Sequence, residues 1–161
     1  MPQLTAIMEA KRGAGKIPIM ADGGMRHSAD LIKALAAGAS AGMFGSLFAG
    51  TDESPGEVVM WNGRRSKIYR GSASLAQHIN RKNGPGDDEI LSDFVSEGAD
   101  QVIIPYKGSV KEVIAQLVGG VRSGMSYCGA KNLQELWKKA EFVRMTLAGI
   151  RESGIHDVED Y

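Results

Sequence analysis

Helix and strand patterns alternate with short connections over the first 46 residues, and this alternation limits the possible folds more than any other feature of the sequence. Residues 2–12 carry apolar side chains at helical spacing, and the apolar run KIPIMA at 16–21 predicts a short buried strand. Ser28 is a plausible N-cap for a helix that ends at Gly38, and residues 40–46 predict a second buried strand. The alternation is typical of a parallel α/β sheet or barrel.

The pattern changes after Ser46. Two strand-like runs within 57–71 flank Asn62-Gly63, the pair best suited to the positive φ angles of a tight turn, and together they predict a β-hairpin. Residues 80–89 are polar, rich in Gly and interrupted by Pro, so we expect a flexible loop there, followed by another short strand within 99–108.

Helical patterns return in the last third of the chain. Ser109 with Glu112 predicts a capping box at the start of an apolar helix that runs to about Gly124, and Asn132 with Glu135 marks the start of a second helix. Residues 141–147 predict either a strand or an extended arm, and the tail from residue 154 has few apolar anchors.

Composition excludes several classes of partner. The chain has 161 residues, enough for one domain, with 19 basic and 19 acidic side chains. Without net charge, neither nucleic acid nor an anionic membrane is an expected partner. No apolar run is long enough to span a bilayer, no secretory signal is visible, and the single cysteine cannot form an internal disulfide. These features suit the cytoplasm. The three histidines are scattered, so no metal site is expected.

Two neighbouring strand ends carry the candidate site. Asp22-Gly23-Gly24 follows the first predicted strand, and Gly45-Ser46 follows the second. Parallel α/β folds bind ligands at the carboxyl ends of their strands, and backbone amides of glycines can approach an anion closely. Gly24, Gly45 and Ser46 could therefore hold a phosphate while Asp22 accepts hydrogen bonds from a sugar diol. Alternatively, the first segment is a plain turn at a helix start, and Gly45 merely ends a strand.

Long stretches of the chain resemble a known family. The sequences PQLTAI, ADGGMRHSADLIKALAAGASAGMFGSLFAGTDESPGE, YRG, PYKGSVKEVIAQLVGGVRSGMSYCGA and EFVRMTLAGIRES are similar to the C-terminal part of inosine-5′-monophosphate (IMP) dehydrogenase and guanosine-5′-monophosphate (GMP) reductase. The resemblance implies an α/β fold, namely the C-terminal portion of a (β/α)₈ barrel. Residues 1–161 would form one partial barrel domain with the last two strands and their helices. Residues 57–106 would form a hairpin and flap insertion.

The resemblance also implies roles for individual residues in binding a purine nucleoside monophosphate. Asp22 would bind the ribose hydroxyls, Gly24 would donate to the phosphate, and Glu97 would hydrogen-bond the base. Gly45, Ser46 and the Tyr69 hydroxyl would complete the phosphate site. The whole implied set of substrate-binding residues is Asp22, Gly23, Gly24, Gly45, Ser46, Tyr69, Gly71, Ser72, Ala73 and Glu97.

The sequence departs from the family in its catalytic groups. Family enzymes attack the purine with a cysteine in a loop before the first helix of this chain, and neither that loop nor the first six strands is present. Cys128 is expected to be a buried structural thiol, so no catalytic residue is assigned. Pro85-Gly86 stands about where the dehydrogenases carry an Arg-Tyr pair, with Arg81-Lys82 the nearest approximation, and Ser72-Ala73 replaces the usual Met-Gly of a base-contacting turn.

Three functions remain open at this point. The chain could be a fragment of an IMP dehydrogenase, which converts IMP to xanthosine monophosphate with NAD, and would then be inactive alone. It could belong to a GMP reductase that uses NADPH, or be a non-catalytic module that binds a nucleotide phosphate. Family enzymes are tetramers, so we expect a homo-oligomer or association with a missing N-terminal half. Two strands cannot close a barrel, which predicts uncovered apolar edges.

Overall fold

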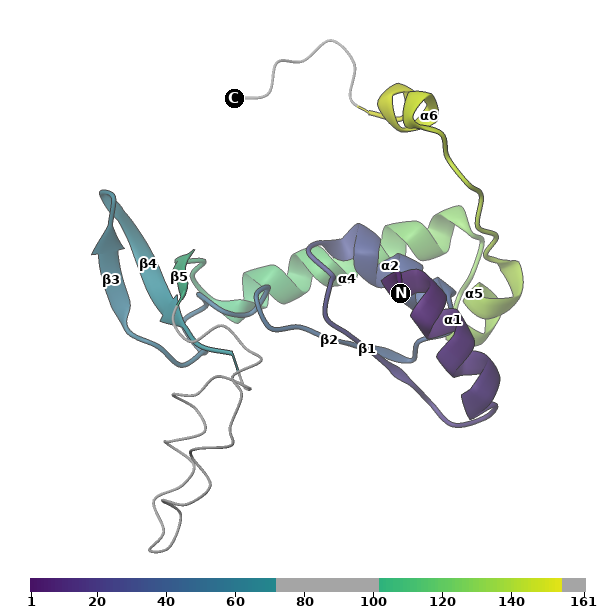
Figure 1. The fold of residues 1–161 in the computed structure, drawn as a ribbon, viewed down its shortest axis with the longest axis horizontal. Coiled ribbons are helices and arrows are strands. Elements are labelled where there is room, and N and C mark those ends of the chain that lie inside the picture. Colours follow the sequence, from purple (N-terminus) through teal and green to yellow (C-terminus); the bar gives the residue numbers. More distant parts are fainter. Residues whose placement is uncertain (72–101, 155–161) are drawn as a thin grey trace, which may run out of the picture.

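A computed structural model describes residues 1–71 and 102–154 as a mixed α/β structure (Figure 1). Its elements in chain order are α1 (Gln3–Ala14), β1 (Met20–Asp22), α2 (Ser28–Ala36), β2 (Ala41–Met43), β3 (Val58–Trp61), β4 (Arg64–Tyr69), β5 (Val102–Pro105), α4 (Val110–Tyr127), α5 (Leu133–Lys139) and α6 (Leu147–Glu152). Within the described residues, no helix is both long and apolar enough to cross a membrane.

The first two strands pair in parallel, as the alternating pattern predicts. Ala21 is opposite Gly42, and the ladder covers only Met20–Asp22. The strand therefore begins later than the predicted 16–21 and includes the aspartate that was expected to follow it. Pro18 has no N–H to donate, and before the strand only the carbonyl of Ile19 is bonded to the neighbouring segment, accepting from Ser40 N–H at 2.8 Å.

The prediction that both strands are buried is wrong. Ala21 is 2% exposed, but Met20 is 54% exposed and Met43 is 49% exposed. A sheet of two strands has two open edges and little area for helices to cover, so side chains beside the central residue stay accessible. The predicted uncovered apolar edges are thus present in the structure.

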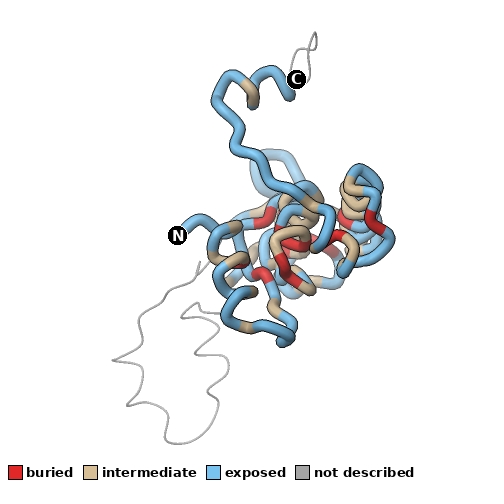
Figure 2. Tube along the Cα trace, turned by 90° about the vertical axis from the view of Figure 1, so that its right-hand side faces the viewer, coloured by how far each residue is buried: buried red, intermediate tan, exposed pale blue. Residues whose placement is uncertain are grey.

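Buried residues gather in the body of the molecule, away from the projecting C-terminal arm (Figure 2). They form one cluster of Ile7, Ala21, Met25, Ala34 and Ala39, and a second between α2, α4 and α5. Two glycines of α4 allow α2 to approach: a Cβ at Gly120 would lie 2.1 Å from the Ser28 hydroxyl, and one at Gly124 would lie 2.6 Å from Ile32. Leu136 of α5 is fully buried, and the Trp137 indole N–H donates to the carbonyl of Leu35 at 2.8 Å. This packing anchors the helix that follows the first glycine turn.

The start of α2 differs from the prediction by one residue. Its N-cap is His27 instead of Ser28, since the Ser28 side chain lies against α4. Asp30 closes the helix start, because its carboxylate accepts from Arg26 N–H and pairs with the His27 ring, each at 2.9 Å.

The capping box predicted for α4 is only partly formed. Ser109 is the N-cap and accepts from Lys111 N–H at 3.4 Å, but a distant glutamate supplies the stronger contacts. Glu53 accepts from the Ser109 hydroxyl at 2.9 Å and from Val110 N–H at 2.7 Å. A carboxylate 57 residues away in sequence therefore satisfies the first turn of α4.

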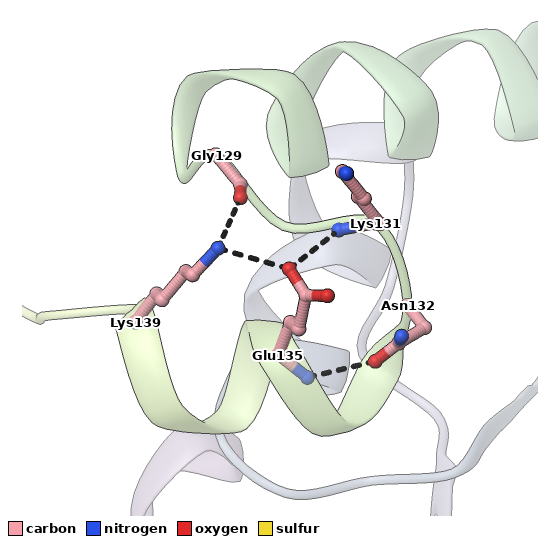
Figure 3. Close-up of polar contacts among 5 residues, drawn as sticks. All are labelled: Gly129, Lys131, Asn132, Glu135 and Lys139. Carbon is pink, nitrogen blue, oxygen red and sulfur yellow. Dashed lines mark hydrogen bonds and ion pairs between the residues drawn. The ribbon is translucent and has the colours of Figure 1, made fainter.

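The predicted start of α5 is confirmed (Figure 3). The Asn132 side chain accepts from Glu135 N–H at 2.9 Å, and the Glu135 carboxylate accepts from Lys131 N–H at 3.2 Å. Lys139 joins this carboxylate at 2.9 Å and also donates to the carbonyl of Gly129. These local contacts connect the end of α4 to α5.

The predicted hairpin and the strand after it are also confirmed. Strands β3 and β4 are antiparallel around Asn62 and Gly63, whose φ angles are 49° and 74°. Strand β5 pairs antiparallel with β4, with Ile68 opposite Ile103, so the sheet order is β3-β4-β5. This sheet lies at the opposite end of the molecule from α1 and α5 (Figure 1).

Residues 140–146 form an arm without helix or strand, one of the two predicted alternatives. The arm leads to α6, which the sequence did not predict, and both views show the arm and α6 projecting from the rest (Figures 1 and 2). Val143 is 82% exposed and Leu147 is 78% exposed. The loop expected at 80–89 and most of the tail expected from residue 154 lie outside the described residues.

Candidate functional site

A cleft of about 860 Å³ lies where the carboxyl ends of β1, β2 and β4 meet. Six of the predicted substrate-binding residues line it: Asp22, Gly23, Gly24, Gly45, Ser46 and Tyr69. The structure thus brings together three segments that are well separated in the sequence.

The wall after β1 is a turn of unusual backbone conformation. Asp22 ends the strand, and Gly23 and Gly24 follow with φ angles of 76° and 73°. A Cβ at either glycine would meet nothing within 4 Å, so the glycines are required by the backbone conformation and not by close packing. Gln3, at the start of α1, donates its side-chain N–H to the Asp22 carbonyl at 2.7 Å and holds the turn in place.

The wall after β2 is a short helical turn. The carbonyl of Gly45 accepts from Phe48 N–H at 3.2 Å and from Ala49 N–H at 2.9 Å. A Cβ at Gly45 would lie 2.9 Å from the Tyr69 hydroxyl, so the missing side chain leaves room for the phenol. The hydroxyl of Tyr69 and the first amides of the turn consequently lie side by side.

Lys107, which the sequence did not single out, supports this turn. Its ammonium donates to the carbonyl of Ser46 at 2.6 Å and to that of Leu47 at 3.0 Å. The side chain is half-buried, and desolvation lowers its pKa below the ordinary 10.5. In the sequence, Lys107 is marked only by its position two residues after the segment that forms β5. That position does not indicate a contact with a residue 60 positions away.

The loop between β2 and β3 forms another wall of the cleft, through Ser54, Pro55, Gly56 and Glu57. It is attached to β4 by Lys67, which is 4% exposed and donates to the carbonyls of Thr51 at 2.7 Å and Ser54 at 2.5 Å. A Cβ at Gly56 would lie 2.2 Å from the carbonyl of Ile68, so only glycine fits there. Glu57 and Arg70 also line the cleft and were not predicted.

The remaining predicted residues are Gly71, Ser72, Ala73 and Glu97. Gly71 follows β4 and does not line the cleft, and Ser72, Ala73 and Glu97 lie outside the described residues, as do Arg81-Lys82 and Pro85-Gly86.

Cys128 is the C-cap of α4, away from the cleft. It is half-buried instead of buried, and it packs against the cluster of Leu35, Ala130 and Leu136.

The geometry of the cleft suits binding more than bond breaking. Backbone amides and a phenol hydroxyl can hold an anion, and the carboxylate of Asp22 can accept from a diol. No cysteine or histidine is among the described residues that line the cleft, so these residues supply no activated nucleophile. Among residues 1–71 and 102–154, no three His, Cys, Asp or Glu side chains are grouped to hold a metal ion.

Comparisons with known proteins all point to the same family. The model of the IMP dehydrogenase / GMP reductase domain matches residues 1–156. The chain is 54% identical to inosine-5′-monophosphate dehydrogenase of Aquifex aeolicus over 99% of its own length and 33% of that protein. It is 43% identical to GMP reductase of Leishmania donovani over 98% of its length and 33% of that protein.

A solved structure is similar as well. A GMP reductase from Trypanosoma brucei in complex with guanosine 5′-monophosphate superposes with a TM-score of 0.83 at 43% identity. The alignment covers 99% of this chain and 32% of that one. The chain therefore spans about a third of the length of the relatives that it matches.

Proposed function

The chain belongs to the IMP dehydrogenase / GMP reductase family, and from this premise we propose that its cleft binds a purine nucleoside monophosphate. The observation that carries the proposal is the convergence of three strand ends on one cleft, with Asp22 at one, Gly45 and Ser46 at the second and Tyr69 at the third. A relative at 43% identity was solved with GMP, which supports this ligand class.

Each part of the ligand has a chemically suited partner in this proposal. The phosphate takes hydrogen bonds from the amides of Gly24, Gly45 and Ser46 and from the Tyr69 hydroxyl. The ribose diol donates to the carboxylate of Asp22, which is exposed to the cleft. Gly23 keeps the backbone in the conformation that this turn requires. We propose main-chain contacts from Gly71, Ser72 and Ala73, and a hydrogen bond from the base to Glu97.

We further propose that the chain is one domain, the C-terminal portion of a (β/α)₈ barrel. Strands β1 and β2 would be its last two strands, and residues 57–106 its hairpin and flap insertion. The parallel pairing of the two strands and the exposure of Met20 and Met43 beside their open edges support this arrangement. The same edges suit association with further copies or with a separate N-terminal half, and such a protein would act in the cytoplasm.

The whole protein's activity is proposed as that of a purine-nucleotide oxidoreductase of the IMP dehydrogenase type. In such an enzyme NAD accepts the hydride when IMP is converted to xanthosine monophosphate. The described residues of the cleft are suited to phosphate and sugar, so no residue of this chain is assigned to NAD. With Cys128 outside the cleft, the chain alone would be inactive.

Two observations favour other functions. Pro85-Gly86 in place of the Arg-Tyr pair favours GMP reductase, which deaminates and reduces with NADPH and needs no hydrolysis. The absence of a cysteine at the cleft favours a binding module without activity.

Titration of the purified chain with IMP, GMP and guanosine tests the binding proposal. We expect both monophosphates to bind more tightly than the nucleoside, and Asp22→Ala and Ser46→Ala to weaken binding. Glu9→Ala, which removes an exposed carboxylate paired with Arg12 on α1, serves as the control. Equal affinities for all three ligands, or equal affinities of all variants, would contradict the proposed site.

Turnover assays separate the activities. Formation of NADH from IMP, or consumption of NADPH with GMP, would each identify an active enzyme. We expect neither from this chain alone. NADH formation that disappears in Cys128→Ala would contradict our assignment of the thiol.

A further inference from the structure

Lys107 is the charged side chain with the most direct contact to the turn after β2. Besides its two side-chain hydrogen bonds to Ser46 and Leu47, its backbone N–H donates to the carbonyl of Gly50 at 2.9 Å. Residue 107 therefore holds the turn from its first residues to its last. Neither the glycine turns nor the family resemblance gives this lysine a role.

These contacts fix the directions of the N–H groups of Ser46 and Leu47. In a planar trans peptide the C=O and the following N–H point in opposite directions. Because the carbonyl of Ser46 faces Lys107, the N–H of Leu47 faces away from the lysine. The carbonyl of Gly45 points along the turn toward Phe48 and Ala49, so the N–H of Ser46 points out of its start.

Within the part of the chain that the structure describes, these two amides have no partner and can take a ligand. Among residues 1–71 and 102–154, no backbone or side-chain acceptor is bonded to the N–H of Ser46 or Leu47. Ser46 lines the cleft beside Gly45, whose missing side chain admits the Tyr69 hydroxyl. Unpaired donors at the start of a helical turn are suited to an anion.

The charge of Lys107 adds to this effect. Its ammonium donates to two carbonyls, and no acidic side chain among the described residues pairs with it. A half-buried ammonium behind this turn, with no acidic partner among residues 1–71 and 102–154, raises the local positive potential.

We propose that Lys107 is a positioning residue for the nucleotide phosphate: it orients the peptide of Ser46 and Leu47 and supplies positive charge behind it. The proposal rests on the proposed function, since the phosphate is that of the purine nucleotide. Lys107 does not line the cleft and need not touch the ligand itself.

Calorimetric titration of Lys107→Met with GMP and with guanosine tests the proposal. We expect the affinity for GMP to fall about tenfold, because the amides of Ser46 and Leu47 would donate less favourably to the phosphate. The affinity for guanosine, which has no phosphate, should stay unchanged. Lys107→Arg keeps the charge and the donors, so its GMP affinity should stay within about threefold of the parent. Lys111→Met removes an equal charge from the exposed side of α4 and is the control for long-range electrostatics.

Several results would overturn the proposal. Unchanged GMP affinity in Lys107→Met would do so, as would an equal loss for GMP and guanosine or an equal loss in Lys111→Met. If Lys107→Met does not fold, as judged by its melting curve, Lys107→Gln keeps an N–H donor without the charge. It should still lose affinity for GMP and not for guanosine, and an unchanged GMP affinity would overturn the proposal.

Amide hydrogen exchange separates this proposal from the proposed function. Lys107→Met should accelerate exchange at Phe48 and Ala49, whose N–H groups hold the turn, without accelerating exchange in α4. If the parent chain binds neither nucleotide, the proposed function fails, and exchange alone then decides whether Lys107 orients the turn. Unchanged exchange at Phe48 and Ala49 would contradict that role as well.

Discussion

The loops around the cleft and the strands that carry them are stabilised in different ways. The turn after β2 and the loop before β3 are held by charged side chains that donate to or accept from the backbone: Lys107, Lys67 and Glu53. The parallel strands β1 and β2, in contrast, have open edges and exposed methionines. The loops of the site are thus held by contacts within the chain, whereas the two-stranded sheet beneath them leaves apolar side chains exposed.

This difference indicates where the stability of the chain lies. The buried apolar residues form two clusters. One, between α1, β1 and α2, consists of Ile7, Ala21, Met25, Ala34 and Ala39, and the other, between α2, α4 and α5, consists of Leu35, Ala130 and Leu136. Val143 in the arm at 140–146 is 82% exposed and contributes little burial. Polar contacts to the backbone can preserve the geometry of a binding loop without a large core, because they fix individual peptide groups.

The largest effect is expected from Leu136→Ala. This side chain is fully buried, and removing it should destabilise the fold by about 2–5 kcal/mol through lost burial and a cavity. Leu147→Ala, in the exposed α6, should change stability by less than about 0.5 kcal/mol. Urea denaturation of both variants measures the two changes in stability. Similar midpoints would show that the core and α6 contribute equally to stability.

A somewhat smaller effect is expected from Lys67→Met. The substitution leaves the carbonyls of Thr51 and Ser54 without their donor in a buried position, which should cost about 1–3 kcal/mol. Lys138→Met, which removes a lysine from the last turn of α5, is the matched control. Urea midpoints measure both, and a stability unchanged in Lys67→Met would contradict the idea that buried charges hold the loop.

Tyr69→Phe tests the cleft directly. Loss of the hydroxyl should weaken GMP binding about fivefold, roughly 1 kcal/mol, and leave guanosine binding unchanged. Tyr106→Phe removes a hydroxyl that donates to Asp52 at 2.5 Å outside the cleft and should not affect either ligand. Calorimetric titration decides, and matching behaviour of the two variants would argue against a phosphate contact by Tyr69.

The smallest effect is a change in the pH dependence of stability on Glu53→Gln. The N–H of Val110, and to a smaller extent the Ser109 hydroxyl, keeps the pKa of Glu53 below its ordinary value of 4.5. Its contribution is therefore complete above pH 4.5 and is lost as the pH falls through the lowered folded value. Urea midpoints from pH 7 to pH 3 should fall less in Glu53→Gln than in the parent, and parallel curves would contradict this role.

Local patterns predicted most of the elements of the fold. The parallel pairing of β1 and β2, the turn at Asn62-Gly63 and the start of α5 at Asn132 depend on near neighbours in the chain, and the structure confirms all three. The start of α2 was misplaced because the Ser28 side chain is taken up by packing against Gly120, a contact that no local pattern contains.

Six of the residues that line the cleft were predicted from the sequence, and the charged residues that hold its loops were not. Asp22-Gly23-Gly24 and Gly45-Ser46 were found because strand ends and glycines are visible in sequence, and Tyr69 came from the family resemblance. Lys107, Lys67 and Glu53 were missed, since a lysine or glutamate on a solvated surface has the same local sequence as one that binds a distant carbonyl or amide.

The sequence by itself determined the order of helices and strands, the positive φ angles at its glycine turns and the family of the chain, because hydrophobic period and turn chemistry are local properties. Only the tertiary structure decided which strand ends share a cleft, which charged side chains hold its loops and which apolar residues stay exposed. Those features depend on contacts between residues far apart in the sequence, such as Lys107 and Ser46, 61 positions apart, and only folding of the chain brings such residues together.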